Sequence, residues 1–89
     1  MLRRLVLDVL KPHVPTNIDV ANEICKIKGV EGVNIVTYNK ETQVESVRIV
    51  IEGKKLNFKR IEKILRNMGA SVQSIDAVSA GRKIISERS

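Results

Sequence analysis

The sequence has few of the residues that build disulfide scaffolds or aromatic binding surfaces. It contains one cysteine among 89 residues, so no disulfide can form within the chain, and a disulfide-framed secreted scaffold is excluded. Tryptophan is absent, and Tyr38 and Phe58 are the only aromatic residues. Two aromatic side chains are too few to form a stacking surface for nucleic-acid bases, and they cannot dominate a core.

Long apolar runs are also missing, because no stretch approaches the roughly 18–20 apolar residues of a membrane span. The first residues place a basic pair before an apolar run, as a signal peptide does, but Asp8, Lys11 and Pro12 interrupt that run. No small-residue cleavage site follows. We therefore expect this segment to form a first strand in a cytoplasmic protein.

The apolar residues that are present follow two kinds of spacing. Alternation predicts four strands, and helical spacing predicts two helices between them. Thr16 or Asn17 can cap the first helix, which Gly29 ends. Asn57 can cap the second helix, which Gly69 ends. The predicted strands cover residues 2–10, 30–38, 44–52 and 70–80.

The order β-α-β-β-α-β predicts a single α+β domain with a ferredoxin-like sandwich fold, a four-stranded antiparallel sheet with both helices on one face. In this fold the first and third strands are central, and the fourth strand pairs with the first. The core residues that we expect from the strands are Leu5, Leu7, Val9, Val33, Ile35, Val47, Ile49 and Ile51. Those that we expect from the helices are Ile18, Ala21, Ile24, Cys25, Phe58, Ile61, Ile64, Leu65 and Met68.

The sheet face without helices is expected to be unusually apolar. Polar residues should occupy this face in a monomer, but the alternation also places apolar side chains on it. Such a patch, rimmed by charge, commonly marks an interface, although β-branched residues favour strands whichever way they point. The apolar residues expected there are Val6, Leu10, Val36, Tyr38 and Val50, among Arg4, Asp8, Asn34, Ser46 and Arg48.

The C-terminal extension, residues 82–89, contains two adjacent isoleucines beyond the completed fold. Ile84 and Ile85 follow Arg82 and need apolar cover. We expect this segment to extend the sheet of a neighbouring subunit, which places these three residues in an oligomer interface. The alternative is a tail that folds back on its own subunit.

The net charge of +6 comes mostly from one segment. Residues 53–69 carry six basic residues and one acidic residue. Lys59, Lys63 and Arg66 recur at helical spacing, with Lys55 nearby, and such a stripe can bind a phosphate backbone non-specifically. The alternative is an ordinary solvated helix face.

Asp8 is an acidic residue inside an apolar strand. If the fourth strand pairs with the first, Asp76 lies close to it, with His13 where the first strand ends. Two carboxylates and an imidazole can bind Ca²⁺ or Mg²⁺. Ion pairing of the carboxylates with nearby arginines is the alternative. Zinc and copper sites are not expected, because the sequence has no cluster of histidine and cysteine.

Catalysis has little support in the sequence. Cys25 lies within the predicted first helix, where a small buried hydrophobic residue is expected, and His13 is too far along the chain to be assigned as its base. We therefore expect no enzymatic activity.

Three stretches resemble an archaeal family known as domain of unknown function 211. They are Leu5–His13 (LVLDVLKPH), Gly29–Ile35 (GVEGVNI) and Ser74–Ile84 (SIDAVSAGRKI). The resemblance implies an archaeal cytoplasmic protein with a ferredoxin-like fold that builds closed homo-oligomers, and it implies no particular activity. Many relatives have glutamate near Ala77, so an acidic site at that position is not expected here.

These features favour a non-catalytic, homo-oligomeric binding or scaffold module. It would bind a divalent cation or another small ligand at subunit interfaces, and it would have no membrane partner. The alternative is a nucleic-acid-associated protein that uses the basic face of the second helix.

Overall fold

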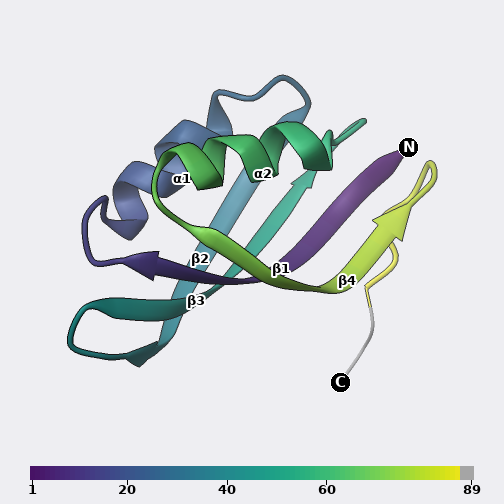
Figure 1. Cartoon of the computed structure of the whole chain (residues 1–89). Coiled ribbons are helices and arrows are strands. Elements are labelled where there is room, and N and C mark those ends of the chain that lie inside the picture. Colours follow the sequence, from purple (N-terminus) through teal and green to yellow (C-terminus); the bar gives the residue numbers. More distant parts are fainter. Residues whose placement is uncertain (87–89) are drawn as a thin grey trace.

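The alternating apolar segments form four strands, and the capped segments between them form two helices. The computed structural model describes residues 1–86. Figure 1 shows both helices on the same face of one sheet, which confirms the ferredoxin-like α+β fold. The elements are β1 (Leu2–Pro12), α1 (Asn17–Cys25), β2 (Val30–Lys40), β3 (Val44–Gly53), α2 (Phe58–Asn67) and β4 (Ser71–Ala80). Residues 87–89, part of the predicted extension, lie outside the described residues.

The sheet has the strand order β2-β3-β1-β4, and all three strand pairs are antiparallel. β1 and β3 are therefore central and β4 pairs with β1, as predicted. β2 and β4 form the two edges of the sheet. The β1–β4 pair contains register shifts, including one between Val6 and Leu7 and one between Asp8 and Val9. The faces of β4 therefore alternate less regularly than those of the central strands.

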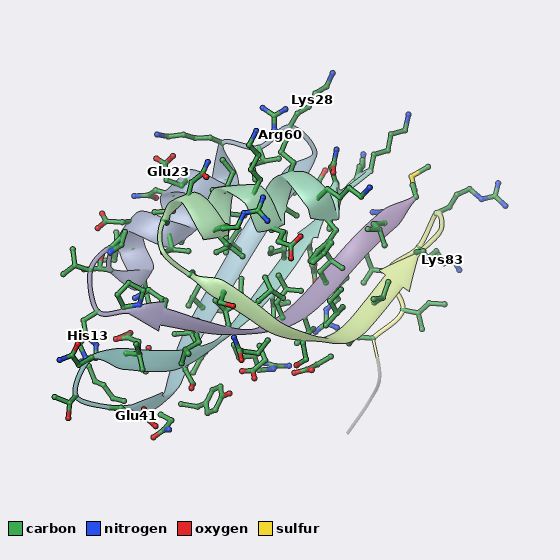
Figure 2. All side chains as sticks on the ribbon, in the orientation of Figure 1. His13, Glu23, Lys28, Glu41, Arg60 and Lys83 are labelled. Carbon is green, nitrogen blue, oxygen red and sulfur yellow. The ribbon has the colours of Figure 1, made fainter. Side chains whose placement is uncertain are left out.

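The core lies between the helices and the central strands. The strand residues that alternation assigned to it are buried on β1 and β3 and partly buried on β2. Burying one such side chain contributes about 1.5–3 kcal/mol relative to leaving it exposed. Figure 2 shows side chains filling the space between the helices and the sheet. The other buried core residues are Val20, Ile24, Ile27, Leu56, Ile61, Leu65 and Ala70.

α1 buries a different face from the predicted one. Thr16 caps the helix and forms a capping box with Asp19. Asn17 donates its side-chain amide hydrogen to Thr37 Oγ1 of β2 (2.9 Å), which turns the face shared by Asn17, Val20 and Ile24 toward the sheet. Ile18 is therefore 74% exposed and Cys25 is also exposed, so their assignment to the core was wrong.

α2 follows its prediction closely. Asn57 caps it by accepting a hydrogen bond from the backbone N–H of Arg60 (3.1 Å). Ile61 and Leu65 are buried, while Phe58, Ile64 and Met68 pack against the core at its margin. Within residues 1–86, no helix has the length and apolar character needed to cross a membrane.

Candidate functional site

The sheet face opposite the helices, called the open sheet face below, contains the residues that alternation assigned to it. Val6 pairs with Val50 and Asp8 with Arg48 across β1 and β3. Directly paired residues of antiparallel strands project to the same face. β2 adds Asn34, opposite Val50, and Val36, opposite Arg48, to this same face. The structure therefore brings together the predicted apolar residues of β1, β2 and β3.

Their exposure differs across this face. Val36 is 48% exposed and Tyr38 is 59% exposed, whereas Leu10 and Val50 are half-buried. Val6 is only 3% exposed although it lies outside the main core cluster. Of the predicted apolar residues of this face, the two on β2 are therefore the accessible ones, and Val6 is not accessible.

The segment after β4 folds back on its own chain. The Arg3 guanidinium donates a hydrogen bond to the carbonyl of Arg82 (2.6 Å), and the Ser79 hydroxyl donates one to the carbonyl of Ile85. Ile84 is half-buried, while the side chain of Ile85 remains largely exposed. In the single chain this segment thus takes the alternative path considered from the sequence. Its role in an oligomer interface stays a prediction.

Asp8 has a partner that sequence reasoning missed. The Tyr38 hydroxyl of β2 donates a hydrogen bond to the Asp8 carboxylate of β1, across the intervening strand β3. This hydrogen bond raises the pKa of Tyr38, and desolvation and the negative charges of Asp8 and Asp76 raise it further. Asp76 itself accepts a hydrogen bond from the Ser74 hydroxyl (2.6 Å). Ser74 pairs directly with Asp8 across β1 and β4, so the Asp76 carboxylate that accepts the hydrogen bond from its hydroxyl lies on the same face as Asp8.

His13 does not join these carboxylates, so the expected grouping of His13 with Asp8 and Asp76 was wrong. Among residues 1–86 there is no group of three or more histidine, cysteine, aspartate or glutamate side chains that could hold a metal ion. The reason is the length of β1, which continues to Pro12 and carries His13 past the last pair of the sheet. Figure 2 shows His13 beside Glu41, in the turn between β2 and β3.

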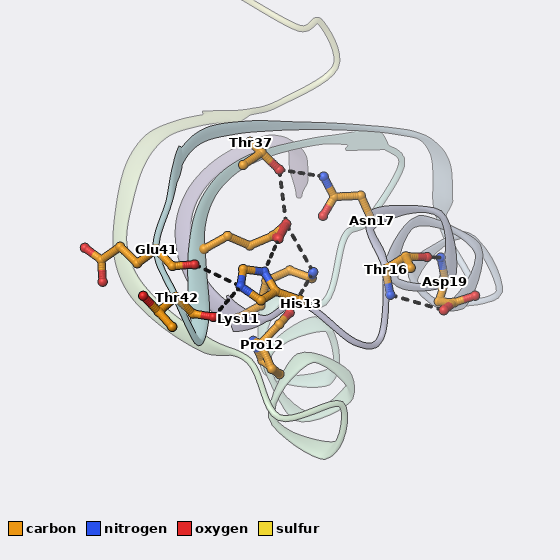
Figure 3. A network of polar contacts seen from close by, with 10 residues as sticks. Lys11, Pro12, His13, Thr16, Asn17, Asp19, Thr37, Glu41 and Thr42 are labelled. Atoms are coloured by element: carbon orange, nitrogen blue, oxygen red, sulfur yellow. Dashed lines mark hydrogen bonds and ion pairs between the residues drawn. The ribbon is translucent and has the colours of Figure 1, made fainter.

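His13 instead belongs to a polar network at the end of β1 (Figure 3). Its Nδ1 lies 2.9 Å from the Glu45 carboxylate, and its Nε2 lies 2.9 Å from the carbonyl oxygen of Glu41. Both ring nitrogens therefore face oxygen acceptors, and only the doubly protonated imidazolium can donate to both. These hydrogen bonds, chiefly the one to Glu45, raise the pKa of His13.

Glu45 is the centre of the network. Its carboxylate accepts a hydrogen bond from Thr37 Oγ1 (3.3 Å) and lies 3.5 Å from Nζ of Lys11. The hydrogen bond with His13, together with the charge of Lys11, lowers the pKa of Glu45 despite its burial. A buried carboxylate held between two cationic groups is stable in its ionised form.

Lys11 and Glu45 were not predicted as site residues, although the sequence carries a signal for them. Lys11 is only 1% exposed, and it follows Leu7 and Val9 in the buried alternation of β1. Glu45 precedes Val47 in the buried alternation of β3 and pairs directly with Lys11. A lysine and a glutamate on the core-facing side of paired strands therefore predict a buried ion pair.

The predicted basic residues fall into two places. Lys59, Lys63 and Arg66 are exposed on α2, and within the described part of the chain they form no ion pair. Lys55 lies apart from them, in the connection between β3 and α2. There it lines a pocket together with Lys28, which precedes β2.

Comparison with known proteins identifies the family to which the chain belongs. The model of the domain of unknown function 211 family, described as "Uncharacterized ArCR", matches residues 3–89. The chain belongs to this family. It is also 43% identical over 86 residues to "Uncharacterized protein MJ0319" of Methanocaldococcus jannaschii, covering 97% of this chain and 89% of that protein. The predicted family is therefore confirmed, and neither of these names states an activity.

Proposed function

We propose that the protein is a non-catalytic module that assembles with further copies of itself through the open sheet face. The observation that carries this proposal is the exposed pair Val36 and Tyr38, flanked by half-buried Leu10 and Val50 on one face of the sheet. A small domain gains stability by burying a second apolar surface. Arg82, Ile84 and Ile85 lie at the margin of this assembly in the proposal.

A second copy fits this face because the face carries both signs of charge. Arg4 pairs with Glu52 (3.3 Å), and Arg48 lies opposite Asp8. A two-fold interface places the same patch on both sides, so it must complement itself. The exposed side of α2 is predominantly positive and would repel its own copy.

The absence of catalysis in this proposal rests on how the titratable groups are used. Lys11, His13 and Glu45 satisfy one another and leave no free general base in their network. Cys25 is exposed, and the hydrogen bonds of His13 go to Glu45, Glu41 and Thr42 rather than to the thiol. An exposed unpaired thiol also fits the cytoplasmic location that we propose.

The interface would also bind a divalent cation through Asp8 and Asp76, without His13. Asp8 pairs with Ser74, whose hydroxyl donates to Asp76, so the two carboxylates lie near each other, and a second copy would bring a second pair. Oxygen ligands of this kind suit Ca²⁺ or Mg²⁺. Calorimetric titration with each ion tests this part, and the absence of both heat and a shift in melting temperature would exclude it.

Light scattering on the full-length chain tests the assembly. The native protein should have the mass of an oligomer, and Val36→Glu should shift it toward the monomer by burying a charge in the interface. Ile18→Glu is the matched control, because Ile18 is also an exposed apolar residue but lies on α1. A monomeric native protein contradicts the proposal, as does equal dissociation in both variants.

The second candidate function is association with nucleic acid. It is favoured by the exposed stripe of Lys59, Lys63 and Arg66 and by the absence of ion pairs to it within residues 1–86. Filter binding at about 50 mM salt tests it, since non-specific phosphate contacts are strongest at low salt. Reversal of the three charges to glutamate should abolish binding, whereas the same reversal at Lys26, Lys40 and Lys83 should weaken it far less.

A further inference from the structure

A pocket at the start of α2 gathers basic side chains from three separate segments. Its volume is about 440 Å³. Lys28 and Gly29 come from the turn before β2, Lys54 and Lys55 from the connection after β3, and Arg60 from the first turn of α2. Asn57, the cap of α2, completes the lining. Figure 2 shows the side chains of Lys28 and Arg60 close together on the helix side.

The charge of this basic pocket is uncompensated. Four of its six lining residues are lysine or arginine, and none is acidic. Within residues 1–86, none of these four side chains takes part in an ion pair. Like charges gathered around one cavity repel each other, and a bound anion of several charges removes that repulsion.

The backbone beneath the basic pocket is tightly packed. The N–H of Lys54 donates to the carbonyl of Gly29 (2.8 Å). A Cβ atom on Gly53 would lie 2.0 Å from that carbonyl oxygen, and one on Gly29 would lie 2.5 Å from the carbonyl oxygen of Lys54. Because both residues are glycine, the two turns can approach closely enough to place Lys28 beside Lys54. The backbone that carries these two lysines is therefore rigid.

Lys55 adopts a conformation that a lysine rarely takes. Its φ is 54°, in the left-handed region where glycine and asparagine are favoured. Such strain in a non-glycine residue commonly accompanies a functional role. Glycine would adopt this backbone conformation with less strain, yet the chain has a positively charged residue there.

We propose that the basic pocket binds a small anion with several phosphate charges, of the kind formed by a pyrophosphate or by the phosphates of a nucleoside diphosphate. Four cations match a multiply charged anion better than a single carboxylate. The volume lies in the range of small-molecule sites, about 300–1,000 Å³. The pocket shares none of its lining residues with the open sheet face, so this binding is a function beyond self-assembly.

Isothermal titration of the full-length protein with inorganic pyrophosphate tests the proposal. Binding should be measurable at low salt and weaker for inorganic phosphate. The double variant Lys28→Gln with Arg60→Gln should lower the affinity at least about tenfold, because it removes two charge-assisted contacts. The matched control, Lys59→Gln with Lys63→Gln, removes the same charge from the exposed face of α2 and should bind nearly as well as the native chain.

Lys55→Gly separates ligand binding from folding. It relieves the left-handed backbone of Lys55, so the melting temperature should not fall, while the affinity for pyrophosphate should fall. Loss of affinity together with loss of stability would indicate a structural role and contradict the proposal. Val36→Glu should leave pyrophosphate binding unchanged, which distinguishes a failure of assembly from a failure of the basic pocket.

Three results would overturn the proposal. The first is no detectable heat with pyrophosphate at about 50 mM salt. The second is equal weakening by the pocket variant and by the control on α2, which would indicate a diffuse charge effect. The third is binding of single-stranded RNA without binding of pyrophosphate, which would assign the basic residues to nucleic acid instead.

Discussion

At the scale of single residues, the network of His13, Glu45 and Lys11 makes the stability depend on pH. The pKa of His13 is raised above 6.5 in the folded chain, so its contribution is complete below that pH and is lost as pH rises through the raised value. The pKa of Glu45 is lowered below 4.5, so its contribution is complete above that pH and is lost as pH falls through the lowered value. Both contributions are therefore complete between these two values.

The first prediction follows from the pH range in which both contributions are complete. His13→Gln should reduce the free energy of unfolding most between pH 4.5 and 6.5, and the difference from the native chain should shrink at higher pH as the native imidazolium loses its proton. Urea unfolding of both chains across this range and up to about pH 9 measures the difference. Both chains are compared at equal concentration, because the proposed self-association would make the stability depend on concentration. A difference that grows with pH would contradict the charge assignment.

At the scale of elements, α1 shows where pattern reading succeeds and where it stops. The N-cap could be predicted, since Thr16 has a local backbone reason to be there, but α1 ends at Cys25, four residues before Gly29, so the prediction that Gly29 ends this helix was wrong. The buried face of α1 could not be predicted, because Ile24 fits both an apolar stripe with Ile18 and one with Val20 in a helix of nine residues. The contact from Asn17 to Thr37 decides between them, and this contact is not local in sequence.

The second prediction tests which face of α1 is buried. Ile24→Ala should lower the free energy of unfolding by about 2–5 kcal/mol, because the side chain is fully buried in the core. Ile18→Ala changes the same atoms on the exposed side of α1 and should alter it by no more than about 0.5 kcal/mol. Chemical denaturation of the two variants gives both numbers. Equal decreases in the free energy of unfolding for the two variants would indicate that Ile18 is also buried in the core.

In the strands too, features set by local alternation could be predicted, whereas contacts between residues far apart in the sequence could not. Strict alternation on β1 and β3 predicted both the core and the open sheet face, because a period of two leaves little freedom once one face is apolar. Lys11 and Glu45 were missed because a charged residue was not expected on the core-facing side. The basic pocket was missed because Lys28 and Lys54 meet through a close backbone approach that no spacing reveals.

At the scale of the whole molecule, the C-terminal segment stabilises its own chain and borders the proposed assembly. Residues 82–85 are held by hydrogen bonds from Arg3 and Ser79, and Ile84 is half-buried. Ile85 remains exposed beside this contact. The same segment can therefore stabilise its own sheet while offering an apolar side chain to a neighbour.

The third prediction concerns a chain that ends at Ala80. Loss of three hydrogen bonds, those accepted by the carbonyls of Arg82 and Ile85 and the one that Gly81 donates to Met1, and of the cover from Ile84 should lower the free energy of unfolding by about 1–3 kcal/mol. A chain that ends at Ser86 keeps these contacts and serves as the control. If Ile85 also contacts a neighbour, light scattering should show a weaker oligomer for the shorter chain at equal concentration. An oligomer that is unchanged by the truncation would confine the segment to its own subunit and leave assembly to Val36 and Tyr38, because their side chains lie on β2, which the truncation does not touch.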